Sequence, residues 1–349
     1  MNRTIKKYNI TIGFPVYNVE KYVYRSLKSA LDQDFNDYEI LIIYDKSIDN
    51  SLEVINNLIS QHPFGYRARV IIRNDKEGLG EARNTAIRNA QGKYIYFMDS
   101  DDYITSDALS KLYNSAVKYD ADITIGSSYK TDGEKTWADK DNEFPNLQYI
   151  KDGEFANYYY NTFRDIMPTT AWNILFKMDF LTKNNLFFPK IKLQEDLAFD
   201  ELYHPYLNKV VFISDKTYYY LIRPDSLMSR DTRKVINIGE AEFAETICNM
   251  MKSWLPQWKG ENFYGGKCAK TMRRCFYEIV GILKHRERFT EPIQDKTLRD
   301  MMKHPESLKT ILKFKQLRNF NLFYYTLGIL PPKIFVKVMV FICHRKGFF

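Results

Sequence analysis

Short apolar runs alternate with amphipathic stretches along the first hundred residues of this chain. The runs are rich in β-branched and aromatic residues, and they predict strands at residues 9–14, 39–43, 69–72 and 94–98. Between them, apolar residues recur at helical spacing and predict three helices, the first with Val23, Leu27 and Leu31 on one face. Because strands alternate with helices through short connections, the pattern predicts a parallel, doubly wound α/β sheet.

Polar residues follow the predicted strands at their carboxyl ends, where doubly wound sheets bind ligands. After the first strand, Pro15 stops the ladder, and Asn18 is expected to cap the next helix. Asp45 and Arg73 follow the second and third strands. No GxGxxG or GxxxxGK[ST] motif occurs in this half, so neither a dinucleotide site nor a P-loop is expected. A nucleotide whose phosphates are neutralised by a metal still fits the pattern.

Three carboxylates lie within four residues after the fourth predicted strand: Asp99, Asp101 and Asp102. Carboxylates clustered at a buried strand end repel one another, so a cation is expected to compensate them. Mg²⁺ and Mn²⁺ prefer oxygen ligands of this kind. The alternative is a solvated acidic turn that leads into the next helix, and the cluster alone leaves both interpretations open.

Beyond Arg230 the apolar spacing is helical to the end of the chain. The most apolar segment is 319–344, but Pro331-Pro332 divides it, and neither half reaches the ~20 apolar residues of a spanning helix. Basic residues flank its apolar positions, namely Lys313, Lys315, Arg318, Lys333, Lys337, Arg345 and Lys346. This pattern favours helices that lie in the interface of an anionic membrane. A helical hairpin packed on the domain and a contact between copies are the alternatives.

The composition, with 45% hydrophobic and 27% charged residues, is typical of a soluble globular protein, and 349 residues suit one large domain with an appendage. The net charge is +8, and Lys and Arg concentrate after Lys252, which indicates an anionic partner such as a membrane surface or a nucleic acid. The four cysteines show no CxxC spacing, so a reducing cytoplasm is expected rather than a zinc site or a disulfide framework. The polar N-terminus predicts no signal peptide.

Several motifs follow one another in order between residues 8 and 230. They are IGFPVYN at 12–18, EARN at 81–84, GKYIYFMDSDD at 92–102, AWN at 171–173, QEDLAF at 194–199 and YYY at 218–220. This series resembles family 2 glycosyltransferases with the GT-A fold. One departure concerns the second strand end, where the family usually reads Asp-Asp-Gly-Ser and this chain reads Tyr44-Asp45-Lys46-Ser47. The departure leaves open which base the chain would bind.

The resemblance implies an α/β GT-A fold, which is Rossmann-like with a mainly parallel sheet flanked by helices. The glycosyltransferase domain would cover 1–230, with a nucleotide-binding half at 8–128 and an acceptor-binding half at 129–230. Residues 231–349 would form a helical C-terminal region that associates with a membrane surface.

The same resemblance implies donor-binding residues. A nucleotide-diphospho-sugar, most often UDP-linked, would be bound by Pro15, Tyr17, Glu20, Asp45, Arg83, Asp99 and Ser100. Asp101, together with Asp99, would ligate Mn²⁺ or Mg²⁺.

Catalytic and acceptor residues are implied as well. Asp196, with Glu195 beside it, would be the catalytic base, and its place at the start of a predicted helix is expected to keep it ionised. Trp172 and Asp102 are expected to contact the acceptor, with a place in the core as the alternative for Trp172. Cations in 223–230 would close over the diphosphate as a lid, unless this segment is simply a solvated loop.

The function implied by the resemblance is a metal-dependent, inverting glycosyltransferase. It would be cytoplasmic, on the inner face of the cell membrane, and would extend a saccharide or lipid-linked saccharide used in cell-surface polysaccharide synthesis. The alternative is a non-catalytic nucleotide- or carbohydrate-binding relative of the same fold. Nucleic-acid binding through the basic C-terminal region is a second alternative, but no known nucleic-acid module supports it.

Overall fold

The computed structural model describes residues 7–74, 77–151, 153–162, 166–223 and 234–349. The chain folds into two compact units. One consists of Met1–Phe155 and Met167–Arg223, and the other of Ala156–Ile166 and Pro224–Phe349. The predicted boundary at residue 230 falls outside the described residues, so the division into domains at that position stays a prediction.

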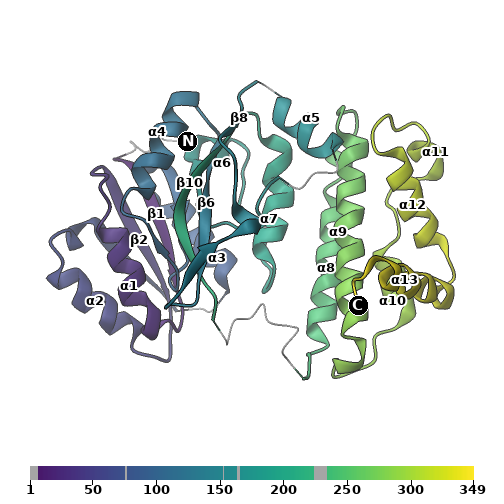
Figure 1. The fold of residues 1–349 in the computed structure, drawn as a ribbon, viewed down its shortest axis with the longest axis horizontal. Coiled ribbons are helices and arrows are strands. Elements are labelled where there is room, and N and C mark those ends of the chain that lie inside the picture. Colours follow the sequence, from purple (N-terminus) through teal and green to yellow (C-terminus); the bar gives the residue numbers. More distant parts are fainter. Residues whose placement is uncertain (1–6, 75–76, 152, 163–165, 224–233) are drawn as a thin grey trace. The chain divides into compact units, whose positions relative to one another are not determined.

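Four parallel strands form one half of the sheet in the first unit, in the order β3-β2-β1-β4 (Figure 1). The strands are β1 (Tyr8–Val16), β2 (Tyr38–Asp45), β3 (Ala68–Arg73) and β4 (Gly92–Phe97). The helices between them are α1 (Glu20–Leu31), α2 (Ser51–Gln61) and α3 (Leu79–Asn89). The predicted parallel, doubly wound arrangement is confirmed.

The other half of the sheet is mixed, and it continues from β4 in the order β9-β6-β10-β5. Strand β9 runs antiparallel to both β4 and β6, whereas β6 and β10 are parallel. The strands are β5 (Tyr103–Ile104), β6 (Ile123–Thr131), β7 (Thr136–Ala138), β8 (Leu147–Tyr149), β9 (Ile174–Lys177) and β10 (Val210–Leu221). The helices are α4 (Ala108–Tyr119), α6 (Met178–Lys183) and α7 (Glu195–Tyr203). Helix α5 (Glu154–Asn161) begins in this unit, but from Ala156 onward it belongs to the second unit. Parallel and antiparallel strands thus share one sheet with helices on its faces, which is the predicted GT-A-like class.

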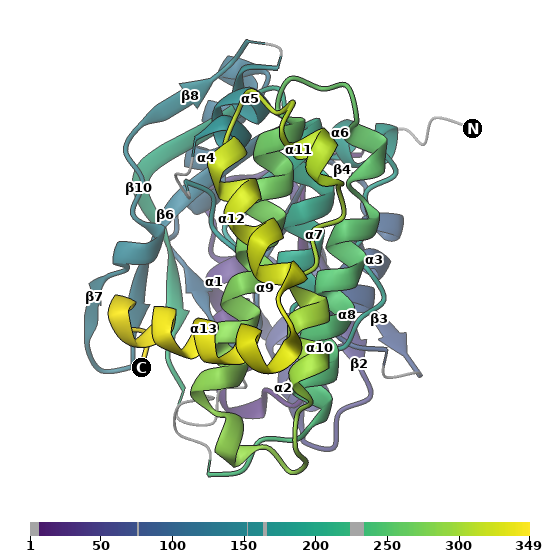
Figure 2. The ribbon, with the colours of Figure 1, turned by 90° about the vertical axis from the view of Figure 1, so that its right-hand side faces the viewer.

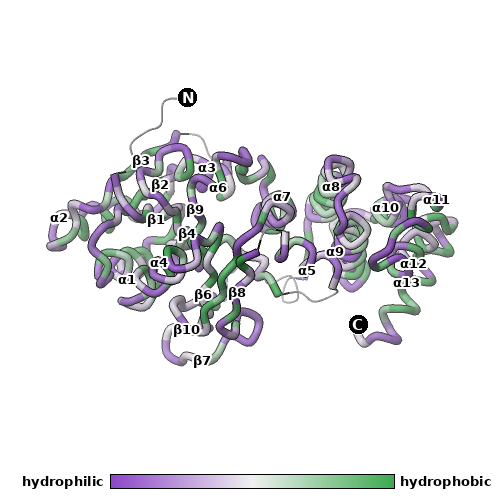
Figure 3. The backbone as a smooth tube through the Cα atoms, turned by 90° about the horizontal axis from the view of Figure 1, so that it is seen from above, coloured by the Kyte–Doolittle hydropathy of each residue, from purple (hydrophilic) through white to green (hydrophobic). Residues whose placement is uncertain are grey.

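Helices cover both faces of this sheet. Seen from above in Figure 3, α1 and α4 lie on one side of the strands and α3 and α6 on the other. On the first side, Leu27 of α1 and Leu112 of α4 join the same buried cluster as Ile12 of β1. On the second side, α3 comes so close to β1 that a Cβ on Gly13 would lie 3.2 Å from the Cβ of Ala86. Strands enclosed on both faces explain the nearly continuous apolar runs in the sequence.

The second unit is helical, with the long, largely buried helix α9 packed against both α8 and α12. Figure 2 shows α12 and α13 as the layer of this unit nearest the viewer, in front of α9. The helices are α8 (Gly239–Ser253), α9 (Tyr264–Lys284), α10 (Asp295–Met301), α11 (Leu308–Ile311), α12 (Arg318–Ile329) and α13 (Pro332–Lys346). Among the described residues, none of the helices has both the length and the apolar character needed to cross a membrane.

Candidate active site

Arg83 of α3 forms ion pairs with three carboxylates that sequence analysis assigned to the site. Its Nη2 lies 2.8 Å from Asp99 Oδ1 at the end of β4, and its Nη1 lies 3.1 Å from Glu195 Oε1. Nη1 also pairs with Asp196 Oδ1. The guanidinium is only 1% exposed, whereas the carboxylates of Asp99 and Asp196 are 24% and 22% exposed. Arg83 therefore lies beneath a cluster of acids that keeps access to solvent.

Three carboxylates around one cation leave an excess of negative charge, which changes the protonation of Asp196. Burial raises the pKa of Asp196 to about 7, and the repulsion from Glu195 and Asp99 adds to the increase, although Arg83 opposes it. Burial lowers the pKa of Arg83, but the three carboxylates more than offset this and raise its pKa above the ordinary value. Arg83 thus stays charged while Asp196 titrates near neutral pH.

The expectation that the start of α7 keeps Asp196 fully ionised is therefore wrong. Asp196 does lie in the first turn of α7, as predicted. The stabilisation of an anion at a helix N-terminus amounts to about 0.3–1 kcal/mol in exposed positions and reaches about 2 kcal/mol in partly buried ones. Burial and two neighbouring carboxylates outweigh it here.

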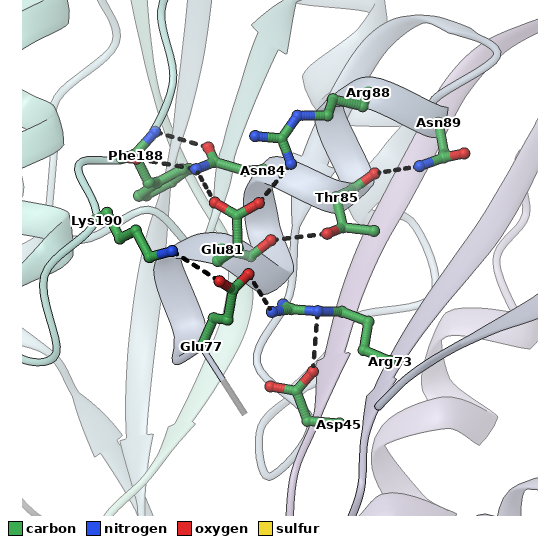
Figure 4. Close-up of polar contacts among 10 residues, drawn as sticks. All are labelled: Asp45, Arg73, Glu77, Glu81, Asn84, Thr85, Arg88, Asn89, Phe188 and Lys190. Atoms are coloured by element: carbon green, nitrogen blue, oxygen red, sulfur yellow. Dashed lines mark hydrogen bonds and ion pairs between the residues drawn. The ribbon is translucent and has the colours of Figure 1, made fainter. Parts of the chain in front are cut away.

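The EARN motif lies in α3, and its Asn84 holds this helix to Phe188 in the segment that leads to α7 (Figure 4). Asn84 accepts a hydrogen bond from the N–H of Phe188 at 2.7 Å and donates one to its carbonyl oxygen at 2.9 Å. Gly80, one turn earlier, allows close approach, because a Cβ there would lie 3.2 Å from the Cβ of Glu195. These contacts fix the distance at which Arg83 reaches the two acids of α7.

Asp102 connects the end of β4 to β10 and is 1% exposed. Its Oδ2 accepts a hydrogen bond from the Tyr218 hydroxyl at 2.7 Å, and its Oδ1 accepts one from the N–H of Leu221 at 2.7 Å. The Tyr218 hydroxyl also accepts a bond from the N–H of Asp99 at 3.2 Å. Burial raises the pKa of Asp102 well above its ordinary range, and the charges of Asp101 and Asp99 raise it further. The structure places Asp102 as a brace for the acidic turn, and its predicted role in acceptor binding stays a prediction.

Asp101 pairs with Arg223, the first residue of the segment whose cations are predicted to close over the diphosphate. Its Oδ2 lies 2.9 Å from Nη2 of Arg223, which follows β10. The guanidinium of Arg223 also lies over the ring of Tyr22, 5.2 Å from its centroid. Arg223 was predicted to lie near the diphosphate, but its pairing with Asp101 was not predicted. The rest of the predicted lid, 224–230, lies outside the described residues.

The donor set at this turn fits a divalent cation that is completed by a substrate. Within the described residues, no group of three or more His, Cys, Asp or Glu side chains could hold a metal by itself. Asp99 and Asp101 are two carboxylates in one turn, and Arg83 occupies Oδ1 of Asp99. Mg²⁺ is commonly bound by one or two carboxylates together with substrate phosphates and water. The residues therefore fit a cation held partly by a diphosphate, rather than a complete protein cage.

The second strand end places Asp45 beside Arg73, with 3.4 Å between Asp45 Oδ1 and Arg73 Nε (Figure 4). Arg73 also lies 3.5 Å from Glu77, and Glu77 accepts a bond from Lys190 at 2.7 Å. Asp45 ends β2, and Asp99 follows β4 in the same parallel sheet, so both lie at its carboxyl edge, as predicted. A role of Asp45 in base recognition stays a prediction.

The loop after β2 caps helix α1, which corrects the expectation for Asn18. The side chain of Asn18 accepts a bond from the N–H of Ile48, and the N-cap of α1 is Val19. The N–H groups of Val19 and Glu20 donate instead to Ser51 Oγ at 3.0 Å and to Asp49 Oδ2 at 2.9 Å. Asn18 adopts a left-handed backbone, with φ of 50°, so it turns the chain toward this loop.

The other predicted donor residues surround this first strand end. Glu20 accepts two bonds from Asn50, both at 3.1 Å, so its carboxylate is held by the capping loop. Pro15 is buried in β1, which continues beside β2 to Val16, so the expectation that Pro15 stops the ladder is wrong. Tyr17 is 37% exposed. Ser100 is buried in the acidic turn. Their predicted roles in donor binding stay predictions.

Trp172 is buried between aromatic rings of β10. It stacks on Tyr218, with centroids 4.5 Å apart, and on Tyr220, with centroids 5.5 Å apart. It is 7% exposed. The next residue, Asn173, donates to the carbonyl oxygen of Gly126 at 2.7 Å. Trp172 thus packs directly on the tyrosine that holds Asp102, and contact with an acceptor stays a prediction.

Comparison with known sequences gives consistent matches. The family model described as Glycosyl transferase family 2 matches residues 11–182. A poly(ribitol-phosphate) beta-glucosyltransferase from Bacillus spizizenii is 34% identical over 224 residues, which cover 62% of this chain and 32% of that protein. Glycosyltransferase GlyG from Streptococcus pneumoniae is 30% identical over 250 residues, which cover 68% of this chain and 80% of that protein. The match therefore spans about a third of the first relative and most of the second.

Solved structures share the fold at low sequence identity. Residues 1–349 of S. aureus TarS, in complex with UDP-GlcNAc, superpose with a TM-score of 0.69 at 18% identity, covering 97% of this chain and 92% of that chain. The mannosyltransferase PcManGT from Pyrobaculum calidifontis, in complex with GDP-Man and Mn²⁺, has a TM-score of 0.50 at 12% identity, covering 95% of this chain and 86% of that chain. These likenesses show the architecture of the chain.

Proposed function

This chain belongs to glycosyl transferase family 2 and is a glycosyltransferase, and from that premise we propose that it transfers a sugar from a UDP-sugar to a saccharide or lipid-linked saccharide in cell-surface polymer synthesis. The complex of TarS with UDP-GlcNAc supports UDP as the nucleotide. The polymer named for the Bacillus relative supports a cell-surface acceptor. The observation that carries the proposal is the acid cluster on Arg83, because it joins the strand-end acids to those of α7.

Asp196 is the general base in this proposal. Its carboxylate accepts the proton of the acceptor hydroxyl as that oxygen forms a bond to the anomeric carbon. The bond from this carbon to the diphosphate breaks, and its electron pair leaves with the nucleoside diphosphate. Attack opposite the leaving group inverts the anomeric configuration. A pKa of about 7 suits the role, since a general base works best when its pKa is near the working pH. Glu195 supports Asp196 through the shared Arg83.

Asp101 and Asp99 are the residues that would hold a divalent cation, Mn²⁺ or Mg²⁺, on the diphosphate side of the donor. The chemistry of such a cation is to offset the negative charge that builds on the departing diphosphate. The complex of PcManGT with Mn²⁺ supports a metal of this kind. Arg223, which pairs with Asp101, is placed to exchange that carboxylate for a phosphate oxygen.

The donor's nucleoside lies along the first two strand ends in the proposed complex. Asp45 contacts the base and Asp99 the ribose side. Pro15, Tyr17, Glu20 and Ser100 line the pocket around them, at the sheet edge where such folds bind nucleotides. The acceptor approaches beside Trp172 and Asp102.

A screen of UDP-sugars in the presence of Mn²⁺ tests the function, with released UDP as the signal. The intact chain should hydrolyse or transfer at least one of these sugars, and Asp101→Asn should abolish that turnover. Asp141→Asn is the matched control, because Asp141 is 81% exposed and its carboxylate pairs with Lys130. Tight UDP binding without any turnover would instead support a non-catalytic relative.

A further inference from the structure

The last 43 residues, 307–349, carry the entire net charge of the chain. They hold eight Lys and Arg residues and neither Asp nor Glu. Removing these eight from the 51 basic residues of the chain leaves 43, which equals the number of acidic residues. The excess of basic over acidic residues is therefore found in α11, α12, α13 and the segments that join them, whereas the rest of the chain is neutral overall.

All eight basic side chains are exposed, and none pairs with an acid in the described parts of the chain. They are Lys309, Lys313, Lys315, Arg318, Lys333, Lys337, Arg345 and Lys346. Elsewhere, exposed lysines commonly have acidic neighbours, as Lys111 does with Asp107 and Asp215. The lack of local compensation leaves a surface that attracts anions.

The same segment exposes an unusual amount of apolar surface. Of the 22 large apolar side chains that are exposed among the described residues, eight lie in 307–349. They are Leu308, Leu312, Phe320, Phe323, Ile329, Ile334, Phe341 and Phe349. Apolar groups at this density, next to basic groups, are typical of interaction surfaces.

Helix α13 shows how the two kinds of residue are arranged. Phe335, Met339 and Cys343 are fully buried at four-residue spacing and attach the helix to its unit. Ile334, Lys337 and Phe341 recur on the opposite side, where Ile334 is 49% and Phe341 61% exposed. In Figure 3 the α12–α13 segment accordingly shows both hydrophobic and hydrophilic stretches.

The charge decides which partner fits this face. A second copy meeting it through the same surface would bring eight positive charges against eight, which is unfavourable. A nucleic acid would use the charges, and its bases could stack on the exposed phenylalanines, but it would leave the exposed aliphatic side chains of Leu308, Leu312, Ile329 and Ile334 uncovered. An anionic bilayer uses both, because headgroups attract the lysines while the apolar side chains enter the acyl boundary.

We propose that the outer face of 307–349 binds the surface of a membrane rich in anionic phospholipid. In the bound state Ile334 and Phe341 lie at the level of the acyl boundary, with Lys333 and Lys337 among the phosphates. The proposal depends on this surface alone, and it stands whether or not the proposed sugar transfer is correct.

Co-sedimentation of the full chain with vesicles tests the proposal. The chain should bind vesicles that contain phosphatidylglycerol and not pure phosphatidylcholine vesicles, and added salt should weaken the binding. The double variant Lys333→Gln/Lys337→Gln should bind roughly 25-fold more weakly, at about fivefold for each charge removed. Ile334→Ser/Phe341→Ser should also lose binding, but with unchanged salt dependence.

The matched control is Val117→Ser/Lys118→Gln on α4, an adjacent apolar and basic pair that is likewise exposed. This control should bind vesicles as the unaltered chain does, and all variants should keep the same hydrolysis of UDP-sugar in solution. Equal binding to both kinds of vesicle would overturn the proposal. So would light scattering that shows a dimer which the α13 variants disrupt, or retention on DNA without binding to vesicles.

Discussion

The guanidinium of Arg83 forms an ion pair with Asp196, although 113 residues separate them along the chain. The same guanidinium holds Asp99, so α3 connects the acidic turn after β4 to the start of α7. Arg83 is almost completely buried, so water cannot take the place of the carboxylates that neutralise its guanidinium. We infer that it is a positioning residue for the predicted metal ligand and the predicted base.

Removing the charge of Arg83 should unfold the site. Arg83→Met leaves three carboxylates without their cation and should lower the free energy of unfolding by about 3–5 kcal/mol. Arg83→Lys keeps the charge but cannot reach all three acids at once, so it should fold while kcat falls roughly 10²-fold. Urea unfolding and steady-state kinetics measure the two effects. Arg88→Lys is the control, since Arg88 lies on the same helix, is half exposed and pairs with Glu81. Wild-type kinetics in Arg83→Lys would contradict the positioning role.

The rate should depend on the ionisation of Asp196. Because its pKa is raised to about 7 and a base must be deprotonated, kcat/KM should rise with pH toward 7 and level off above it. Asp196→Asn should reduce kcat roughly 10²–10⁴-fold at every pH. A pH profile of the intact chain with no inflection near neutrality would argue against Asp196 as the base.

Stability should depend on pH through the same group. An acid with a raised pKa in the folded state favours the protonated folded form. The contribution of Asp196 to the free energy of unfolding is therefore fully present below about pH 4, the pKa of an unfolded Asp. It is lost as the pH rises to about 7. The difference in unfolding free energy between Asp196→Asn and the unaltered chain should accordingly grow over this window. A constant difference from acid to neutral pH would show that the pKa of Asp196 is ordinary.

The hydroxyl of Tyr218 should matter more than that of its neighbour. Tyr218→Phe removes the bond to buried Asp102 and the acceptor for the N–H of Asp99, so it should cost about 1–3 kcal/mol of unfolding free energy. Tyr219→Phe is the control, because the ring of Tyr219 stacks between Tyr103 and Tyr129 and is partly exposed. Equal unfolding free energies for the two variants would contradict the inference that the Tyr218 hydroxyl braces Asp102.

A conservative substitution of Trp172 distinguishes a role in packing from a role in acceptor binding. Trp172→Phe keeps a ring on Tyr218 and should fold with a modest loss of stability. If Trp172 contacts the acceptor, the variant should raise KM for the acceptor and leave KM for the UDP-sugar unchanged. Equal rises of both KM values would assign the residue to packing alone.

The local pattern of apolar residues was sufficient to predict the strands in the parallel half of the sheet. The runs that became β1, β2 and β4 are largely buried on both faces, and burial of that kind appears directly as continuous apolar sequence. The edge strand β3 is only partly buried, but its β-branched residues still indicated a strand. The start of α7 at Glu195 was likewise visible, because acids precede an apolar helical pattern there. The position of β9 between β4 and β6 was not predicted, since pairing across such a sequence separation leaves no local signal.

The site was predicted through the family motifs and only in part through the residues. The resemblance placed Arg83 beside the nucleotide, but its contacts with three acids depend on α3 and α7 packing at Gly80. The capping of α1 by Asp49 and Ser51 and the pairing of Asp101 with Arg223 also join distant segments. Such contacts are set by the tertiary fold, and residue type alone does not specify them.

The central claim is that Asp101, together with Asp99 on Arg83, would hold a divalent cation against the donor's diphosphate, while Asp196 on the same Arg83 faces the acceptor. A crystal soaked with Mn²⁺ and UDP tests this most directly, through the anomalous signal of manganese. We predict a manganese peak bonded to Asp101 or Asp99 and to the diphosphate, with Asp196 on the side of the acceptor. A diphosphate without manganese at the acidic turn, or Asp196 directed away from it, would contradict the claim.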